Sequence, residues 1–145
     1  MDEIPSVRLI QISWLVVLAF TCSNVVVTIS VALENAKGGF LGSALASGWA
    51  SVSNLVYGIA GTKVALGGGS PLEVGIIIGQ GIALAELYFT IMVLLFLQAR
   101  DSDDDVAVAN DTAGSFALFN VIILAGFSVI LYSHSTPYLR ADPYM

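Results

Sequence analysis

The sequence predicts an all-α integral membrane protein, an antiparallel bundle of four transmembrane helices that forms a single domain over residues 1–145. Composition is the first observation, because 57% of the residues are hydrophobic and only 11% are charged, which is unusual for a water-soluble domain. The second observation is three long apolar stretches, in residues 9–33, 72–97 and 115–133. At about 1.5 Å of rise per residue, each can cross a hydrocarbon core about 30 Å thick.

Residues 9–33 are predicted to form the first span. Pro5 and Ser6 stand where helices commonly begin, and Arg8 can keep its charge in the headgroup layer. The stretch is too long for a cleavable signal sequence, so we expect a retained helix. Cys22, the only cysteine, lies inside it, which excludes a disulfide framework and a cysteine-rich metal site.

Residues 40–62 are predicted to form the second span, which contains no charge. The polar residues 34–39 end in two glycines, a common helix stop, and so short a connection makes the first two helices antiparallel neighbours. Small side chains recur every four residues along this span, which permits close backbone approach. They are Gly42, Ala46, Ala50 and Gly58, with Asn54 in the same series and Ser43, Ser47 and Ser51 beside it.

Residues 72–97 are predicted to form the third span, after a glycine-rich turn in residues 63–71. Pro71 suits the first turn of a helix. Small residues recur here too, at Gly75, Gly79 and Ala83. We expect these small-residue faces to pack inside one monomer, and assembly with further copies or with another subunit is the alternative.

Residues 115–133 are predicted to form the fourth span, between an acidic loop at residues 99–113 and a short tail at residues 134–145. The loop holds five of the chain's eleven acidic residues, and the net charge is −6. Its Asp-rich, Lys-poor composition resembles the exposed segments of haloarchaeal proteins, and the acidity argues against nucleic acid as a partner. Asp101, Asp103 and Asp105 alternate as in a calcium loop, but the turn glycine and the closing Glu are absent. No metal site is therefore expected.

Glu86, at the middle of the third span, is the main functional candidate. An ionised carboxylate at this depth costs about 2.5–3.5 kcal/mol on insertion scales, so Glu86 should be protonated, paired or turned toward an internal cavity. It follows Ala83 by three residues, and we expect it to point into the protein on the small-residue face. Asn24, Asn54 and Asn120 place one amide in each other span, and antiparallel threading brings Asn24 and Asn120 within reach of Glu86. We predict a structural polar cluster, with proton or cation binding as the alternative.

No catalytic residues are predicted. His134 is the only histidine, and no Ser-His-Asp arrangement, phosphate-binding loop or pair of haem ligands can be assembled from the sequence. We therefore expect a non-enzymatic chain without a cofactor.

The small size, the four closely linked spans and the Asp-rich residues 101–111 are together similar to the small internal membrane protein of haloarchaeal pleomorphic viruses. The resemblance implies a structural virion component that lies in the lipid envelope beneath a separate spike protein and acts in assembly or budding. Two alternatives are a transport or energy-coupling subunit that uses Glu86 as its ion site, and an accessory subunit of a respiratory or photosynthetic complex. The expected partners are the lipid bilayer and other membrane-protein subunits or further copies, in a virion envelope or in the cell membrane of a halophilic archaeon.

Overall fold

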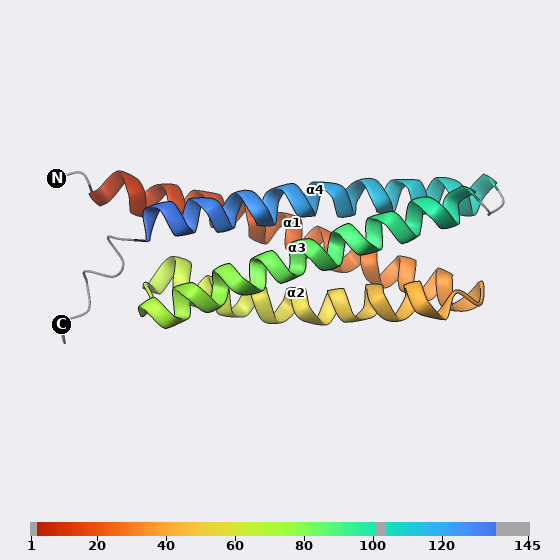
Figure 1. Ribbon diagram of the computed structural model, residues 1–145, viewed down its shortest axis with the longest axis horizontal. Helices are drawn as coiled ribbons and strands as arrows, with labels where there is room; N and C mark the ends of the chain where they lie inside the picture. The colour runs from red at the N-terminus through yellow and green to blue at the C-terminus, as the bar shows by residue number, and fades with distance from the viewer. Residues whose placement is uncertain (1–2, 101–103, 136–145) are drawn as a thin grey trace.

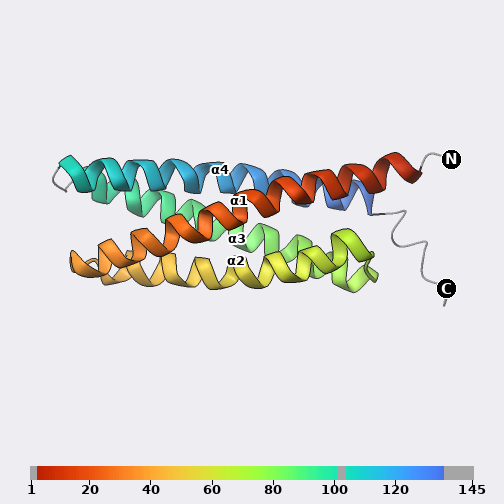
Figure 2. The ribbon, with the colours of Figure 1, turned by 180° about the vertical axis from the view of Figure 1, so that it is seen from behind.

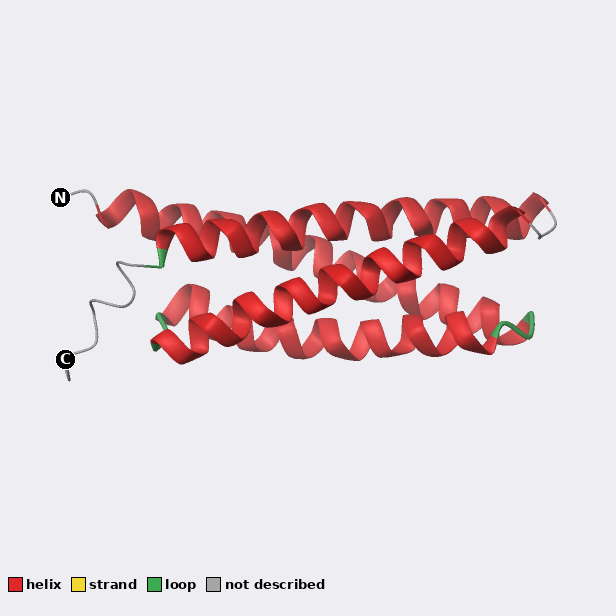
Figure 3. Ribbon diagram, in the orientation of Figure 1, coloured by secondary structure: helices red, strands yellow, loops and turns green. Residues whose placement is uncertain are grey.

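The computed structural model is an antiparallel bundle of four α-helices (Figure 1) and describes residues 3–100 and 104–135. The helices are α1 (Glu3–Lys37), α2 (Leu41–Gly67), α3 (Pro71–Arg100) and α4 (Asp104–His134). They account for nearly all of the described chain, and only short loops join them (Figure 3). The predicted fold class is therefore confirmed.

Each helix packs mainly against two others, so that the order around the bundle is α1, α2, α3, α4 and back to α1. Both views show that α1 begins beside α4 and ends beside α2 (Figures 1 and 2). Helix α3 begins beside α2 and ends beside α4. Turns between sequential helices place the α1–α2 and α3–α4 connections at one end of the bundle. The α2–α3 connection lies at the other end with the start of α1.

A glycine ends the first helix as predicted, and another ends the second, although both helices run further than expected. Residues 34–37 continue α1, and the chain turns at Gly39, whose φ of +82° favours glycine. In the same way α2 continues to Gly67, and Gly68 adopts a φ of +75°.

The prediction of an acidic loop over residues 99–113 is wrong for most of its length. Arg100 still belongs to α3, and α4 already begins at Asp104. Carboxylates in the first turn of a helix are favourable because they face the positive end of the helix dipole, so an acidic, solvated segment can be helical. Asp101 and Asp103 of the calcium-loop pattern lie outside the described residues, as do residues 136–145 of the tail.

Three helical segments, Val7–Lys37, Pro71–Arg100 and Val106–His134, are long and apolar enough to cross a membrane. The chain is therefore an integral, multi-pass membrane protein. Helix α2 is not among the three because its many Gly, Ser and Ala residues lower its hydropathy. Its 27 residues nevertheless extend about 40 Å, alongside α1 in the bundle.

The bundle interior differs along its length. Toward the start of α1 the buried side chains are mainly apolar, among them Ile10, Val17, Val64, Val74, Ile77 and Leu131. Toward the α1–α2 connection the interior also buries polar side chains from three helices, namely Asn24, Thr28, Asn35, Ser43, Ser47, Ser51 and Asn110, which we call the polar half. Trp14 lies within the apolar end between the rings of Tyr57 and Phe127, with centroids 5.5 and 5.2 Å away, in edge-on and tilted arrangements.

Candidate functional site

Glu86 lies at the middle of α3 but on its outer face. The inward face of this helix consists of residues spaced by three or four, namely Val74, Ile77, Gly81, Leu84, Ala85, Tyr88, Ile91 and Leu95. A helix turns by about 100° per residue, so Glu86 points almost opposite to Tyr88, two residues later, and its side chain is exposed. The expectation that Glu86 points into the protein is wrong, because the tyrosine takes the inward position at this level.

The small residues of α3 share the outer face with Glu86. Gly75, Gly79 and Ala83 are exposed, and a Cβ atom built on either glycine would meet no described atom within 4 Å. Packing inside one monomer, which we expected for these residues, is therefore not what the structure shows. Together with Glu86 and Thr90 they form one stripe, which we call the outer α3 face.

The Glu86 carboxylate lies deep in the membrane-spanning segment. It is the only charged side chain between Glu73 and Arg100, and it lies about 20 Å along the helix from each of them. Thr90 Oγ1 donates a hydrogen bond to the backbone carbonyl of Glu86 at 3.0 Å, but no described group donates one to the carboxylate. The exposed carboxylate therefore has no partner among the described residues.

The three predicted asparagines are buried, and two of them, Asn24 and Asn54, lie beside Tyr88 instead of Glu86. Asn54 Nδ2 donates a hydrogen bond to the Tyr88 hydroxyl, and Asn24 lies near the same hydroxyl, although its Nδ2 has no hydrogen-bond partner among the described residues. Asn120 Nδ2 bonds the Phe116 carbonyl of its own helix at 2.8 Å. The structure thus contains a polar cluster at mid-depth, with Tyr88 in the place assigned to Glu86.

Sequence reasoning missed Tyr88, although α3 carries a signal for it. Positions 77, 81, 84, 88, 91 and 95 alternate steps of four and three residues, the spacing of a helix seam that packs against other helices. Tyr88 lies on this seam, and Glu86 does not.

The small-residue series of α2 divides between inside and outside. Ala50 and Gly58 are buried, and a Cβ on Gly58 would lie 3.8 and 3.9 Å from side-chain atoms of Leu18 and Thr21 on α1. Ala46 is half-buried, and Gly42 is exposed with open space around it, so Gly42 does not serve packing within the monomer.

Two buried hydroxyl groups link α1 and α2 beside this series. Thr28 Oγ1 and Ser51 Oγ lie 2.7 Å apart, and Ser51 Oγ also donates to the Ser47 carbonyl at 3.0 Å. Ser51 therefore adds an interhelical hydrogen bond to the close packing of α1 and α2, whereas the Ser47 hydroxyl has no partner among the described residues.

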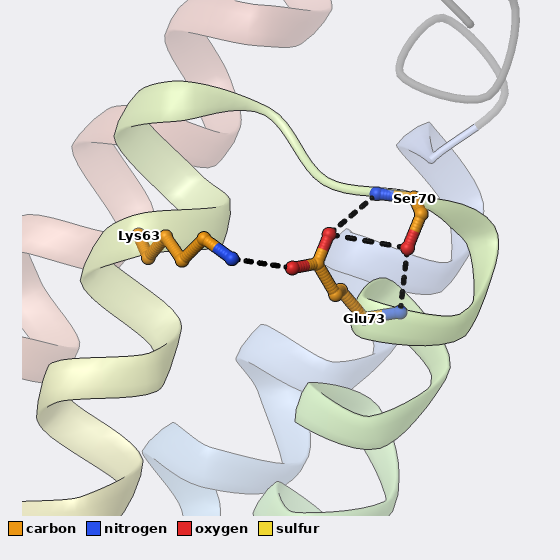
Figure 4. A network of polar contacts seen from close by, with 3 residues as sticks. All are labelled: Lys63, Ser70 and Glu73. Carbon is orange, nitrogen blue, oxygen red and sulfur yellow. Dashed lines mark hydrogen bonds and ion pairs between the residues drawn. The ribbon is translucent and has the colours of Figure 1, made fainter.

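A polar network fixes the turn between α2 and α3 (Figure 4). Lys63 Nζ lies 2.6 Å from Glu73 Oε1, and the backbone N–H of Ser70 donates to Glu73 Oε2 at 2.9 Å. The Ser70 hydroxyl in turn accepts from the Glu73 N–H at 3.3 Å. This reciprocal pair is a capping box at the start of α3, just before Pro71, and the lysine ties it to α2.

Among the described residues, no three His, Cys, Asp or Glu side chains lie close enough to hold a metal ion. The chain matches no family model, no curated protein sequence and no solved structure. The feature best suited to a function is the outer α3 face, which places a lipid-exposed carboxylate within a row of small residues.

Proposed function

We propose that the chain is a non-enzymatic structural membrane protein that assembles laterally with copies of itself through the outer α3 face. One observation carries the proposal: Glu86 is exposed at the centre of α3, in line with Gly75 and Gly79, around which there is open space. All four helices belong to the embedded bundle in this proposal, with α2 crossing beside α1.

Lipid tails do not drive helices together by a hydrophobic effect, so association in a bilayer relies on close packing and on hydrogen bonds. Glycines four residues apart let two backbones approach closely. An unpaired carboxylate facing lipid is unfavourable, which gives this face a further reason to find a partner. The outer α3 face offers both features in one stripe.

A second copy is the partner that fits this stripe. Copies inserted in the same direction are related by an axis normal to the membrane, and a two-fold interface brings the same residues together at the same depth. Glu86 then meets Glu86 of the other copy, where the carboxyl groups can hydrogen-bond as an acid pair. Gly75 and Gly79 leave room for the backbones to come close enough.

Oligomerisation in bilayers tests this assembly. We expect the wild-type chain to dimerise in liposomes, as measured by energy transfer between labelled copies at increasing lipid dilution. Loss of an interhelical hydrogen bond costs about 0.6–1.7 kcal/mol in a membrane, so Glu86→Leu should weaken the dimer by about 3- to 18-fold. Gly79→Ile should weaken it as well, by filling the contact.

Gly126→Ile is the matched control. Gly126 lies on α4, away from the outer α3 face, and is likewise exposed with open space around it. A monomeric wild-type chain, or equal effects of the Gly79 and Gly126 variants, would contradict assembly through α3.

We further propose that the membrane is a virion envelope in a halophilic system, as the resemblance to the haloarchaeal viral protein implies. The support is the architecture: four helices joined by short turns, with an acidic segment at the α3–α4 end where Asp111 is exposed. Quantitative mass spectrometry across a density gradient tests the setting. Enrichment in released lipid particles beside a spike protein supports the envelope, whereas co-migration with a respiratory or photosynthetic complex supports an accessory subunit instead.

A transport or energy-coupling role is the second candidate, and the same lipid-depth carboxylate favours it, because an ion site could form where copies meet. Glu86→Gln separates the two roles. An amide can still hydrogen-bond across the interface, so a structural role keeps assembly largely intact. An ion-binding role predicts loss of proton or sodium flux in liposomes while the oligomer persists.

A further inference from the structure

The polar half of the bundle contains hydrogen-bond donors that have no partner among the described residues. They are Asn24 Nδ2, Asn35 Nδ2, Ser47 Oγ and Asn110 Nδ2. These side chains are at most 3% exposed. A buried donor left unpaired costs about 1–3 kcal/mol, and lipid surrounding the bundle offers no replacement. Several such donors in one region indicate a ligand that supplies acceptors.

A small cavity of about 10 Å³ lies among these groups. Asn24, Thr28 and Ser47 contribute its polar lining, and apolar side chains of α1, α3 and α4 complete the wall. A cavity of about 10–15 Å³ is the smallest that holds one water molecule. The lining contains no charged side chain, and the unpaired Asn24 atom is a donor, so the cavity suits a neutral acceptor better than a cation.

We propose that water enters the polar half of the bundle from the end with the α1–α2 connection. One ordered water molecule occupies the cavity, where it accepts a hydrogen bond from Asn24 Nδ2 and bonds Ser47 Oγ. This water supplies the partner that the two side chains lack, and hydration of the interior extends from one membrane surface to about mid-depth.

The route to the cavity follows two seams of the bundle. On α1, Asn24, Thr28 and Asn35 lie on one buried face, with Thr28 four residues after Asn24 and Asn35 seven residues after Thr28. On α4, Asn110 is followed at buried positions by Ala113 and Ala117, both small, and Ala113 and Ala117 themselves line the cavity. Unpaired Asn35 and Asn110 thus lie where water would enter.

An aromatic layer limits the hydrated region at its inner end. Trp14 is fully buried between Tyr57 and Phe127, and its indole N–H is already bonded to Thr62 Oγ1 at 3.2 Å. Beyond it the interior is lined by apolar side chains such as Ile10 and Ile77. The Tyr57 hydroxyl within the layer also has no partner among the described residues, but the described side chains beyond the layer add no further unpaired donor, so water is expected on one side of the layer only.

Water-edited solid-state NMR of the labelled full chain in lipid bilayers tests the proposal. We expect magnetisation to pass from water to Asn24, Thr28 and Ser47 several-fold faster than to Ile10 and Ile77. Uniformly slow transfer would show a dry interior, and uniformly fast transfer would refute the one-sided entry; either result overturns the proposal.

Two variants examine the ordered water itself. Asn24→Leu should abolish fast transfer to Thr28, and Ser47→Ala, a milder change that keeps the fold if the first does not, should reduce it. Ser128→Ala is the control, because Ser128 is buried but already bonds the Leu124 carbonyl at 2.9 Å. Unchanged transfer to Thr28 in Ser47→Ala, or an equal reduction in Ser128→Ala, would overturn the assignment.

Discussion

Replacement of Gly61 by alanine should destabilise the bundle, because the indole of Trp14 occupies the space that the new methyl group needs. A Cβ atom at position 61 would lie 2.2 Å from Trp14 Cη2 and 2.7 Å from Cζ2 and Cζ3. Carbon atoms normally approach to about 3.5–4.0 Å, so the ring must move by more than 1 Å. The ring has little freedom to do so, since Tyr57 and Phe127 flank it and Thr62 holds its N–H.

The expected size follows from three contributions. Overpacking of a filled core costs about 1–3 kcal/mol, and a weakened Trp14–Thr62 hydrogen bond adds about 0.6 kcal/mol in a membrane. Alanine is a better helix former than glycine by about 1 kcal/mol, which offsets part of the loss. The free energy of unfolding should therefore fall by about 0.6–2.6 kcal/mol.

Reversible unfolding by SDS in mixed micelles, followed by circular dichroism, measures this change. Gly126→Ala is the matched control, because it makes the same substitution at an exposed helix position with open space. It should be neutral or slightly stabilising. In a Trp14→Phe background, whose smaller ring lacks the clashing atoms, Gly61→Ala should cost less. Equal stability of Gly61→Ala and Gly126→Ala would refute the reasoning.

Three further predictions concern other parts of the bundle. Gly81→Ala should lower the free energy of unfolding by about 1–3 kcal/mol, because its Cβ would lie 2.6 Å from Ser128 Oγ; a loss no smaller in a Ser128→Ala background would contradict this cause. Lipids brominated in their tails should quench the fluorescence of Trp49, which is 66% exposed, far more than that of the fully buried Trp14 when each is the sole tryptophan; weak quenching of Trp49 would place α2 outside the lipid. Ser70→Ala should cost about 1 kcal/mol through loss of the helix cap, and an unchanged SDS midpoint would show that the capping box contributes nothing.

The sequence by itself determined that the chain forms helices in a membrane. The bilayer core offers no water to the backbone N–H and C=O groups of a long apolar segment, so these groups must hydrogen-bond with one another. An α-helix makes all of these hydrogen bonds within one segment. Local chemistry also determined where turns occur, since Gly39 and Gly68 adopt the positive φ that a helix end favours and Pro71 follows a capping serine. These features depend only on residues that are neighbours in the chain, and hence they can be predicted from the sequence.

The helix boundaries beside the acidic segment could not be predicted as well from the sequence. Aspartates predicted a solvated loop, and the structure has helix from Asp104 onward. Solvation and helicity are compatible outside the hydrocarbon, so polarity alone does not locate the end of a helix.

Only the tertiary structure decided which face of each helix turns inward. In α3 two faces compete, the seam through Tyr88 and the small-residue stripe through Glu86, and both repeat at helical spacing. In a water-soluble protein the more polar face would turn outward, but here lipid and core are both apolar, so polarity does not separate them. The rotation of α3 depends instead on where the Tyr88 hydroxyl meets the buried Asn54 of α2, a residue distant in sequence that only the assembled bundle brings close.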